Sequence, residues 1–540
     1  MILTDPHKRL TFRQKSYRQC GLSQRNRSDS RIPDFGIAWT GFEVRSEILN
    51  IRWGGIRRRD ARRAKHRAVF IIPPQAAPDL LLCREACLVL HGPHRVLVVS
   101  DADGGEMVSV PTGASRCPIV IDASGQDIHA EIARIREQGP VAEVELPGGV
   151  KAWSVTSYEE IRKLLVDPRV SKDAYQHWNA WRSGEVGPEW PLAIWVSVQN
   201  MVTAYGEEHT RLRKPVATAF TARGVTALRP RVAELTEGLL DELAALPAGE
   251  AVDLRERFAH PLPMAVMSEL FGIPGHCHGA LHRIIKTFFS TAITQEEAQD
   301  NVRLLYATMA DLVAEKRLAP GEDLTSLLIA VRTDDGAALS EKELIDNLIL
   351  LYTAGYETTV NLIDNAVAAL LSRPGELDRL RKGEARWADA VEEALRLDAP
   401  GAHSVLRYAV EDITVGDTLI RKGDAIMVSY AAAGRDPQWH GPEAHRFDVT
   451  RPTRRDHLSF GHGTHYCLGA QLARMEAEIG LSRLFARFPG LTLAVAPDEL
   501  RPQSSFISNG HQELPVHLAP VACPPGPGGT ASPAVRPRSR

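Results

Sequence analysis

The sequence predicts a mainly α-helical protein with small β-sheets, an α+β fold. Apolar residues recur mostly at helical spacing from about residue 157 to Pro400, and residues 341–373 alone could form one helix of about 50 Å. Two short runs, VAEVEL at 141–146 and VKAWSV at 150–155, indicate strands joined by a turn, and further short strands are expected around 405–430. We therefore expect a helical body, a long helix that crosses it, and small sheets beside it.

The composition of the 540 residues is that of a globular protein with material for a large core, at 44% hydrophobic and 24% charged residues. The seven cysteines are irregularly spaced and lack a paired C-x-x-C motif, which argues against a disulfide framework and a structural zinc site. Apolar runs are cut by proline or charge before the roughly 18 residues that a membrane helix needs. We expect a soluble, cytoplasmic protein that binds neither membranes nor nucleic acid.

Residues 1–106 differ from the rest of the chain in charge. They contain 19 of the 64 Lys+Arg and 11 of the 67 Asp+Glu, which leaves 45 against 56 for residues 107–540. Stretches such as IRRRDARRAKHR lack sustained periodicity and predict a disordered arm, and a true start at Met107 would make the whole segment a misread extension. We therefore place one domain at 107–519 and a flexible Pro/Gly-rich tail at 520–540.

A helix is expected on each side of the first hairpin. Residues 127–138 show an amphipathic helical pattern before it. After it, either Thr156 with Glu159 or Ser157 with Glu160 forms a capping box that begins the next helix.

The long helix has clear boundaries in the sequence. Ser340 and Glu343 form a capping box at its start, and Pro374 follows its end. Within it, Gly355 weakens the hydrogen-bonded ladder and Thr358 can bond back to a carbonyl. A local opening of the helix is expected there.

The segment FGHGTHYCLG at 460–469 places a lone cysteine among glycines. Gly461, Gly463 and Gly469 allow the backbone to turn tightly and to lie close against a flat ligand. Apolar residues at helical spacing follow Cys467, so its sulfur is expected at a helix N-terminus, where N–H groups and the helix dipole favour a thiolate. An isolated cysteine is more often simply buried, but the flanking pattern favours a thiolate that is the axial ligand of a haem iron.

The stretch FGHGTHYCLGAQLAR resembles, position by position, the haem-binding loop of the cytochrome P450 family. Its fixed pattern, Phe-Gly-x-Gly-x-His-x-Cys-x-Gly, would arise by chance in fewer than about one such chain in 10⁵. The resemblance covers about 117–518 and looks most like soluble bacterial members of actinomycete secondary metabolism. It implies a cytochrome P450 fold with haem b (iron protoporphyrin IX) buried between the long distal helix and the cysteine loop, and Cys467 as the axial ligand of the iron. Within the loop, the haem would be bound by Phe460, Gly461, His465, Cys467 and Gly469.

The pentapeptide AGYET, which begins at Ala354, resembles the family's distal oxygen-activation motif. The resemblance implies that Glu357 is its acid and Thr358 its alcohol, and that both are catalytic. It also implies substrate contacts at Leu350, at Ala354 and within residues 178–199, 288–293, 401–405 and 506–508. Standing alone, the same five residues also fit an ordinary helix with a surface glutamate.

The pair Glu393 and Arg396 lies one helical turn apart in EEALR. Its position after the long helix and before the cysteine loop is that of the family's structural ion pair, so we assign it a structural role. Spacing alone does not single it out, because the same Glu-x-x-Arg pattern recurs at Glu131/Arg134, Glu208/Arg211, Glu376/Arg379 and Glu443/Arg446.

His209 and Arg213 lie one helical turn apart on one face of the segment EEHTRLRKPV, a pattern that a solvated basic helix also produces. The resemblance implies that they hold the haem propionates together with Arg407 and His465. Arginine suits this role because its planar fork can bond both oxygens of a carboxylate.

Two further clusters have simpler interpretations. His276, Cys277 and His278 are adjacent, and adjacent residues rarely point at one ion, so we expect a loop with a buried thiol. Residues 178–195 are rich in tryptophan, which indicates a local hydrophobic cluster, although the family carries a substrate-covering loop here. The residues are Trp178, Trp181, Trp190 and Trp195.

The resemblance implies a monooxygenase that inserts one oxygen atom from O₂ into an apolar organic substrate, by hydroxylation or epoxidation. Neither a flavin fingerprint nor a G-x-G-x-x-G motif is evident, so a separate ferredoxin and ferredoxin reductase are expected to supply electrons. Arg454, Arg455 and Arg474 flank the cysteine loop and would meet an acidic ferredoxin. Two alternatives stay open: a peroxide-driven peroxygenase, which would also use Cys467, and a non-catalytic haem carrier or sensor.

Overall fold

The computed structural model describes residues 117–518 except 219, 248, 333–337 and 405, together with the backbone of four short strands nearer the N-terminus. Two compact units are distinguished, Met1–Arg116 and Cys117–Arg540. Apart from those strands, the predictions for residues 1–106, for a start at Met107 and for the tail at 520–540 lie outside the described residues.

In the first unit the strands form one antiparallel sheet in the order β1-β2-β4-β3. No strand was expected in residues 1–106 from the sequence. The strands are β1 (Ile37–Ala38), β2 (Val69–Ile72), β3 (Cys87–His91) and β4 (His94–Val98).

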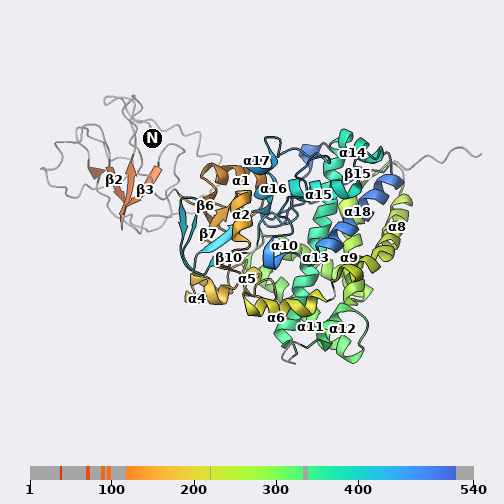
Figure 1. The fold of residues 1–540 in the computed structure, drawn as a ribbon, viewed down its shortest axis with the longest axis horizontal. Coiled ribbons are helices and arrows are strands. Elements are labelled where there is room, and N and C mark those ends of the chain that lie inside the picture. Colours follow the sequence, from red (N-terminus) through yellow and green to blue (C-terminus); the bar gives the residue numbers. More distant parts are fainter. Residues whose placement is uncertain are drawn as a thin grey trace, which may run out of the picture. The chain divides into compact units, whose positions relative to one another are not determined.

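The second unit is mainly helical with small sheets, as the sequence predicts; β6 and β7 lie near α1 and α2, whereas β15 lies near α14 and α18 (Figure 1). Its helices are α1 (Ile128–Glu137), α2 (Tyr158–Leu164), α3 (Ala174–His177), α4 (Asn179–Ser183), α5 (Ile194–Ser197), α6 (Glu207–Ala217), α7 (Ala222–Ala227), α8 (Arg229–Ala244), α9 (Pro261–Phe271), α10 (His278–Phe289), α11 (Gln295–Leu318), α12 (Leu324–Ala330), α13 (Glu341–Leu371), α14 (Pro374–Arg381), α15 (Trp387–Leu397), α16 (Tyr430–Gly434), α17 (Pro437–His440) and α18 (Ala470–Arg487). Short turns of other helix types are η3 (Arg255–Ala259, π-helical), η4 (Gly275–Cys277), η5 (Gly463–His465) and η6 (Pro497–Glu499).

The principal sheet of this unit has the strand order β5-β6-β7-β13-β10-β8, and β6 and β7 are the predicted hairpin. Two smaller sheets have the orders β11-β12 and β14-β15-β9. The strands are β5 (Ile119–Val120), β6 (Val141–Leu146), β7 (Val150–Val155), β8 (Val170–Ser171), β9 (Ala251–Asp253), β10 (Arg407–Ala409), β11 (Ile413–Val415), β12 (Thr418–Ile420), β13 (Ala425–Val428), β14 (Thr492–Leu493) and β15 (Pro515–His517).

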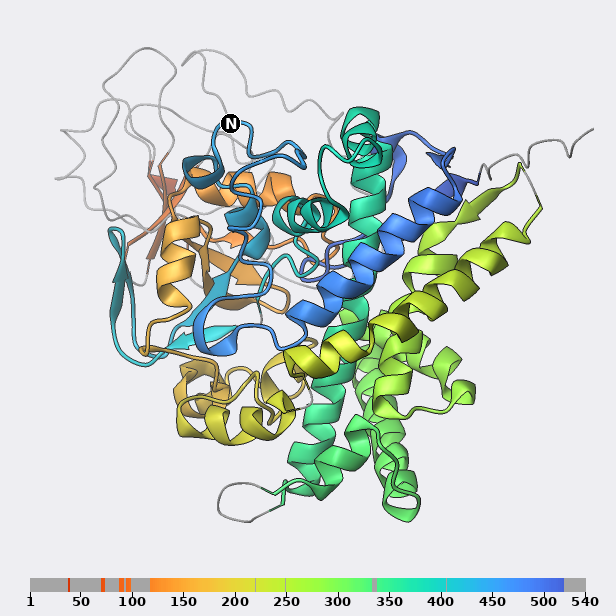
Figure 2. The same cartoon turned by 45° about the vertical axis from the view of Figure 1, so that its right-hand side comes forward.

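Helix α13 runs through the helical part of this unit, and α18 crosses it obliquely (Figure 2). Helices α9, α11 and α15 also pack against α13, and the residues between these helices form the largest hydrophobic core. Because α13 is surrounded along most of its length, it is buried on nearly all sides instead of carrying a single apolar stripe.

The predicted start of α13 is confirmed. The Ser340 hydroxyl accepts from the Glu343 N–H, and the Glu343 carboxylate accepts in return from the Ser340 N–H. The predicted opening at Gly355 is wrong, because α13 runs unbroken from Glu341 to Leu371. A Cβ at Gly355 would lie 2.6 Å from the Met267 methyl, so this glycine permits close packing against α9.

The predicted cap of α2 is only partly right. The helix starts at Tyr158, but the Ser157 side chain makes no capping hydrogen bond. The Tyr158 N–H donates instead to Asp436 Oδ2 at 2.8 Å, from a residue far along the chain. A residue far along the chain therefore accepts the hydrogen bond that a neighbouring side chain was expected to accept.

The tryptophan-rich segment forms the predicted hydrophobic cluster. Trp178 and Trp190 are buried against the principal sheet, where Trp178 stacks on Tyr408 with ring centroids 5.3 Å apart. Trp195 lies apart from that stack, 4.7 Å from the ring of Phe288 on α10. Most of the segment is therefore core, and Trp195 alone of these tryptophans contacts α10 through a ring.

Candidate functional site

The cysteine loop folds back on itself immediately before α18. The Cys467 N–H donates to the Phe460 carbonyl at 2.9 Å, which closes the loop. Gly461 and Gly463 have φ angles of +72° and +71°, a conformation that side chains other than glycine rarely adopt. A Cβ at Gly463 would also lie 2.8 Å from Val166 Cγ1, so the loop lies tightly on the end of α2.

The Cys467 side chain is exposed even though the loop is packed into the fold. The N–H groups of Gly469 and Ala470 at the start of α18 donate to its sulfur, as expected at a helix N-terminus. Although solvent reaches this side chain, the protein around the sulfur raises the pKa of the thiol above its usual value, against the effect of these N–H groups and of Arg213. The helix N-terminus thus favours a thiolate as expected, but its effect is smaller than that of desolvation.

One stripe of α13 is accessible in the middle of an otherwise buried helix. Between residues 344 and 370 every described side chain is buried except those of Leu350, Ala354, Gly355 and Thr358. These positions recur at the spacing of one helix face. This accessible stripe is therefore the face of α13 that a bound ligand could contact.

The structure separates the two residues of the predicted distal motif. Thr358 lies on the accessible stripe, and its hydroxyl donates to the Ala354 carbonyl at 2.5 Å. Glu357 is 2% exposed, and its Oε1 accepts from Arg255 Nη2 at 2.8 Å and from Gln503 Nε2 at 2.7 Å. Burial raises the pKa of Glu357, and Arg255 opposes this shift. Glu357 is therefore a buried carboxylate held away from the stripe, and the interpretation of a surface glutamate is wrong.

Five cationic or imidazole side chains from different parts of the chain gather beside the cysteine loop. They come from the residue after β8, from α6, from β10 and from η5: Lys172, His209, Arg213, Arg407 and His465. The rings of His209 and His465 lie 4.2 Å apart, and Arg213 Nη2 donates to the Tyr466 carbonyl at 2.5 Å. The structure thus brings together all four of the predicted propionate-binding residues, and it adds Lys172.

This cationic cluster has no anion among the residues that the structure describes. No carboxylate pairs with any of the five, and both ring nitrogens of His209, Nδ1 of His465 and Nε of Arg407 are buried without a hydrogen-bond partner. Burial, with Arg213 and Lys172, lowers the pKa of His209 to about 4, and burial with Arg407 lowers that of Lys172 well below its usual value. Buried donors without acceptors are costly, so the cluster is suited to a ligand with two carboxylates.

Glu393 and Arg396 form the predicted ion pair, and both are fully buried. Arg396 binds the carboxylate through Nε at 2.8 Å and Nη2 at 2.7 Å, and it also donates to the carbonyls of Gly434, Ala444 and Arg446. Arg451 adds a second contact to Glu393 at 3.2 Å. The pair therefore ties α15 to the segment that leads into the cysteine loop.

A second ion-pair network supports the loop directly. Glu392 accepts from Arg474 Nε at 2.7 Å and lies 2.9 Å from His457 Nε2. The Arg474 guanidinium lies 4.4 Å from the centroid of the Phe460 ring. Two of the three arginines predicted to meet a ferredoxin are thus engaged internally, since Arg454 is bonded to Asp389 at 2.9 Å.

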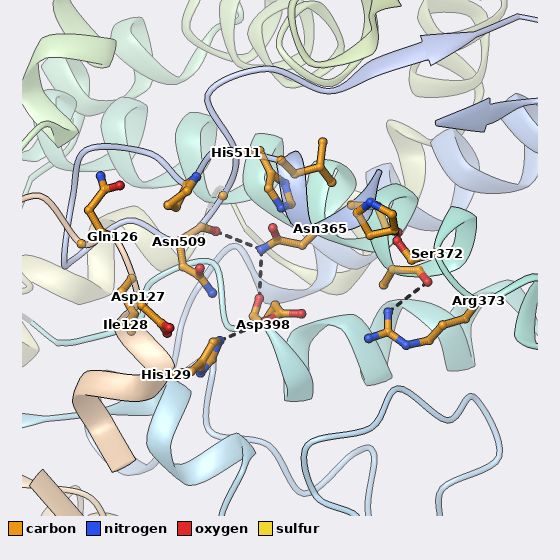
Figure 3. Close-up of a pocket in the computed structure, with 17 residues that line it drawn as sticks. Gln126, Asp127, Ile128, His129, Asn365, Ser372, Arg373, Asp398, Asn509 and His511 are labelled. Atoms are coloured by element: carbon orange, nitrogen blue, oxygen red, sulfur yellow. Dashed lines mark hydrogen bonds and ion pairs between the residues drawn. The ribbon is translucent and has the colours of Figure 1, made fainter. Parts of the chain in front are cut away.

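A polar cavity of about 320 Å³ lies between the start of α1, the end of α13 and residues 497–511 (Figure 3). His129, Asp398, Asn365 and Asn509 line it, and Figure 3 shows the hydrogen bonds that join them. Neither Cys467 nor the accessible stripe of α13 borders this cavity. It is therefore distinct from the candidate site.

His511 links that cavity to the buried ion pairs of Arg255 with Asp364 and Glu357. Its Nδ1 lies 3.1 Å from Asp364 Oδ2, which pairs with Arg255 Nη1 at 2.9 Å. Arg255 in turn holds Glu357. Arg255 and Lys172 were not predicted as functional residues, because the local sequence does not distinguish a buried arginine or lysine from an exposed one.

The comparisons with known proteins agree with this geometry. A family model described as Cytochrome P450 matches residues 388–508. The chain is 44% identical over 402 residues to 2-hydroxy-5-methyl-1-naphthoate 7-hydroxylase of Streptomyces carzinostaticus, covering 74% of this chain and 98% of the relative. It is 38% identical to mycinamicin IV hydroxylase/epoxidase of Micromonospora griseorubida, covering 73% and 96%.

Among solved structures, CYP154A1 of Streptomyces coelicolor A3(2) is 51% identical and superposes with a TM-score of 0.71, covering 74% of this chain and 100% of that one. In the part of the chain that the structure describes, no helix is both long enough and apolar enough to span a bilayer.

Proposed function

The chain belongs to the cytochrome P450 family, and on that premise we propose that it hydroxylates or epoxidises a bulky, carbon-rich substrate of secondary metabolism with electrons from a ferredoxin. It is a monooxygenase, and its cofactor is haem b. The residue assignments rest on one observation. Beside an accessible cysteine lies a cluster of cationic and imidazole side chains that has no anion among the described residues. A haem supplies both of the missing partners, iron for the sulfur and two carboxylates for the cations.

The binding residues follow from the chemistry of each end of the cofactor. Cys467 would be the axial ligand, and the bound haem would supply the chemistry of oxygen activation. Arg213, Arg407 and Lys172 would bind the propionates, with His209 and His465 donating through their unpartnered nitrogens. Phe460, Gly461 and Gly469 would form the close surface on the sulfur side, where bulkier residues would push the ring away.

Thr358 and Glu357 would both take part in proton transfer. Thr358 lies on the accessible stripe, and its hydroxyl oxygen keeps a lone pair free because its proton is donated to Ala354. Glu357 would bring protons from the buried side when it leaves Arg255, since burial raises the pKa of this carboxyl and so favours its protonated form. This division of roles favours O₂ over peroxide as oxidant, because peroxide already carries its protons.

The substrate class is inferred from the relatives and from one aromatic contact. The named relatives act on a naphthoate and on a mycinamicin. In this chain, half-buried Trp195 and Phe288 form an aromatic surface on α5 and α10. Leu350 and Ala354 present small apolar surface on the accessible stripe, and such walls bind apolar rings.

The electron donor is proposed to be a separate acidic ferredoxin in the cytoplasm. Arg455 is the one of the three predicted arginines that stays largely exposed, at 54% of its side chain, and it lies 3.7 Å from Asp389. Long-range attraction to an acidic partner is screened by salt. The rate of ferredoxin-driven reduction should therefore fall steeply with added salt, and a rate independent of salt would contradict this docking.

The experiment that tests the function compares wild type with Cys467→Ser. The reduced wild type should show the carbon-monoxide absorption that thiolate ligation produces, and the variant should lose it. Ferredoxin, its reductase and NADPH should then support product formation from naphthoate- or macrolide-type compounds. Turnover with hydrogen peroxide alone at an equal rate would favour a peroxygenase. Absence of product with every redox partner would favour a haem carrier or sensor.

A further inference from the structure

Glu256, His260 and His282 bring three metal-binding side chains together away from the cysteine loop. Glu256 and His260 lie one turn apart, from η3 to the start of α9, and His282 projects from α10. One oxygen or nitrogen atom from each lies within 4.8 Å of the other two. The imidazole rings are 4.6 Å apart, and His282 Nε2 is 3.9 Å from Glu256 Oε2.

We propose that Glu256, His260 and His282 bind one zinc ion. Two imidazoles and one carboxylate, with a fourth position left to water, are a donor set that zinc takes in proteins. Zinc bonds of about 2.0–2.1 Å in a tetrahedron place the ligand atoms about 3.4 Å apart, so the three groups would draw together by about 1 Å. The Glu256 side chain, 58% exposed, has the freedom to make this movement.

Tyr356 provides the outer contact that an imidazole ligand needs. The Tyr356 hydroxyl lies 2.8 Å from His260 Nδ1, in the buried space between η3, α9 and α13. When Nδ1–H donates to the phenol oxygen, Nε2 of His260 keeps its lone pair for the metal, as in most protein zinc sites.

The cations near the two imidazoles are balanced by carboxylates or exposed to water. The charge of Arg255 is itself balanced by two buried carboxylates at 2.8 and 2.9 Å. The other nearby cations, Arg283 and Lys286, are exposed on α10, where water screens their repulsion of a cation.

The position of the site gives it a mechanical consequence. A zinc ion here would join α10, through His282, to η3 and the residue before α9, through Glu256 and His260. Helix α10 also carries Phe288, which contacts Trp195 in the proposed substrate wall. Bound zinc would therefore hold in place the helix that contributes this wall, and it would do so without touching the haem.

Zinc titration of the haem-loaded protein tests the proposal. The holoenzyme, freed of metal by a chelator and dialysis, should bind one zinc ion per chain at this site in calorimetry. Glu256→Gln and His282→Gln should each weaken the affinity by at least about 10-fold. His276→Gln is the matched control, because His276 is an exposed histidine of η4 outside the cluster. Zinc should raise the melting temperature of wild type and of the control more than that of either cluster variant.

Two outcomes would overturn the proposal. One is a wild type that takes up no zinc, and the other is zinc affinity in both cluster variants equal to that of the wild type. Glu256 and His282 are at least partly exposed, so loss of the fold is not expected, and an unchanged carbon-monoxide spectrum verifies this in each variant. If one variant fails that check, the other decides.

Discussion

Replacing Arg396 with methionine should lower the melting temperature of the holoenzyme by about 7 °C. Arg396 and Glu393 are both fully buried, so the variant removes two donors from the carboxylate and one charged donor from each of three carbonyls. Breaking a buried ion pair costs about 3–5 kcal/mol. The low end applies, because Arg451 stays 3.2 Å from Glu393 and compensates part of its charge.

The carbonyls add to this cost. Each loses a charged donor, and at about 1 kcal/mol apiece the total destabilisation becomes about 6 kcal/mol. The unfolding entropy is about 2.1 cal/mol/K per residue, or about 0.8 kcal/mol/K for a unit of about 400 residues. Dividing the first quantity by the second gives the shift of about 7 °C.

The measurement is thermal unfolding followed by circular dichroism, with haem content checked in each sample. Arg446→Met is the control, because Arg446 and Glu443 have the same Glu-x-x-Arg spacing but side chains that are 70% and 53% exposed. An exposed pair of this kind contributes less than about 1 kcal/mol, so the control should shift by about 1 °C or less. Equal shifts in the two variants would refute the reasoning that burial, and not spacing, gives the pair its role.

Three further predictions concern the proposed site and its support. Thr358→Ala should consume NADPH with less product per electron, because the hydroxyl on the accessible stripe is lost; unchanged coupling in paired NADPH and product assays would contradict its role. Lys172→Met should lower haem affinity yet stabilise the haem-free protein, since it removes a buried cation without an anion; haem titration and apoprotein melting measure the two effects, and a destabilised apoprotein would count against the cluster. Although burial opposes the shift, His457 and Arg474 lower the pKa of Glu392 to about 2, so its stabilising effect is complete above about pH 4.5 and is lost as the pH falls towards 2. Glu392→Gln should flatten the acid side of a stability profile, and an equally steep profile would contradict this linkage.

Local sequence predicted the features that depend on neighbours in the chain. The capping box of Ser340 with Glu343, the hairpin of β6 and β7, and the helix after Cys467 all follow from spacing and turn residues, and all are present. The cap of α2 was mispredicted because Asp436, 278 residues away from Tyr158, supplies the acceptor. The cluster of Glu256, His260 and His282 could not be predicted for the same reason, because folding brings these residues together from η3 and α10.

The sequence by itself determined the family and singled out Cys467 as the proposed haem ligand, because a flat ligand close to a sulfur requires glycines and a cysteine at fixed short spacing. It also placed Glu357 beside Thr358. Only the tertiary structure decided that Glu357 is turned into a buried network with Arg255, and that five cationic and imidazole groups meet without an anion among the described residues. Burial and long-range charge set the protonation of these groups, and neither can be read from neighbours along the chain.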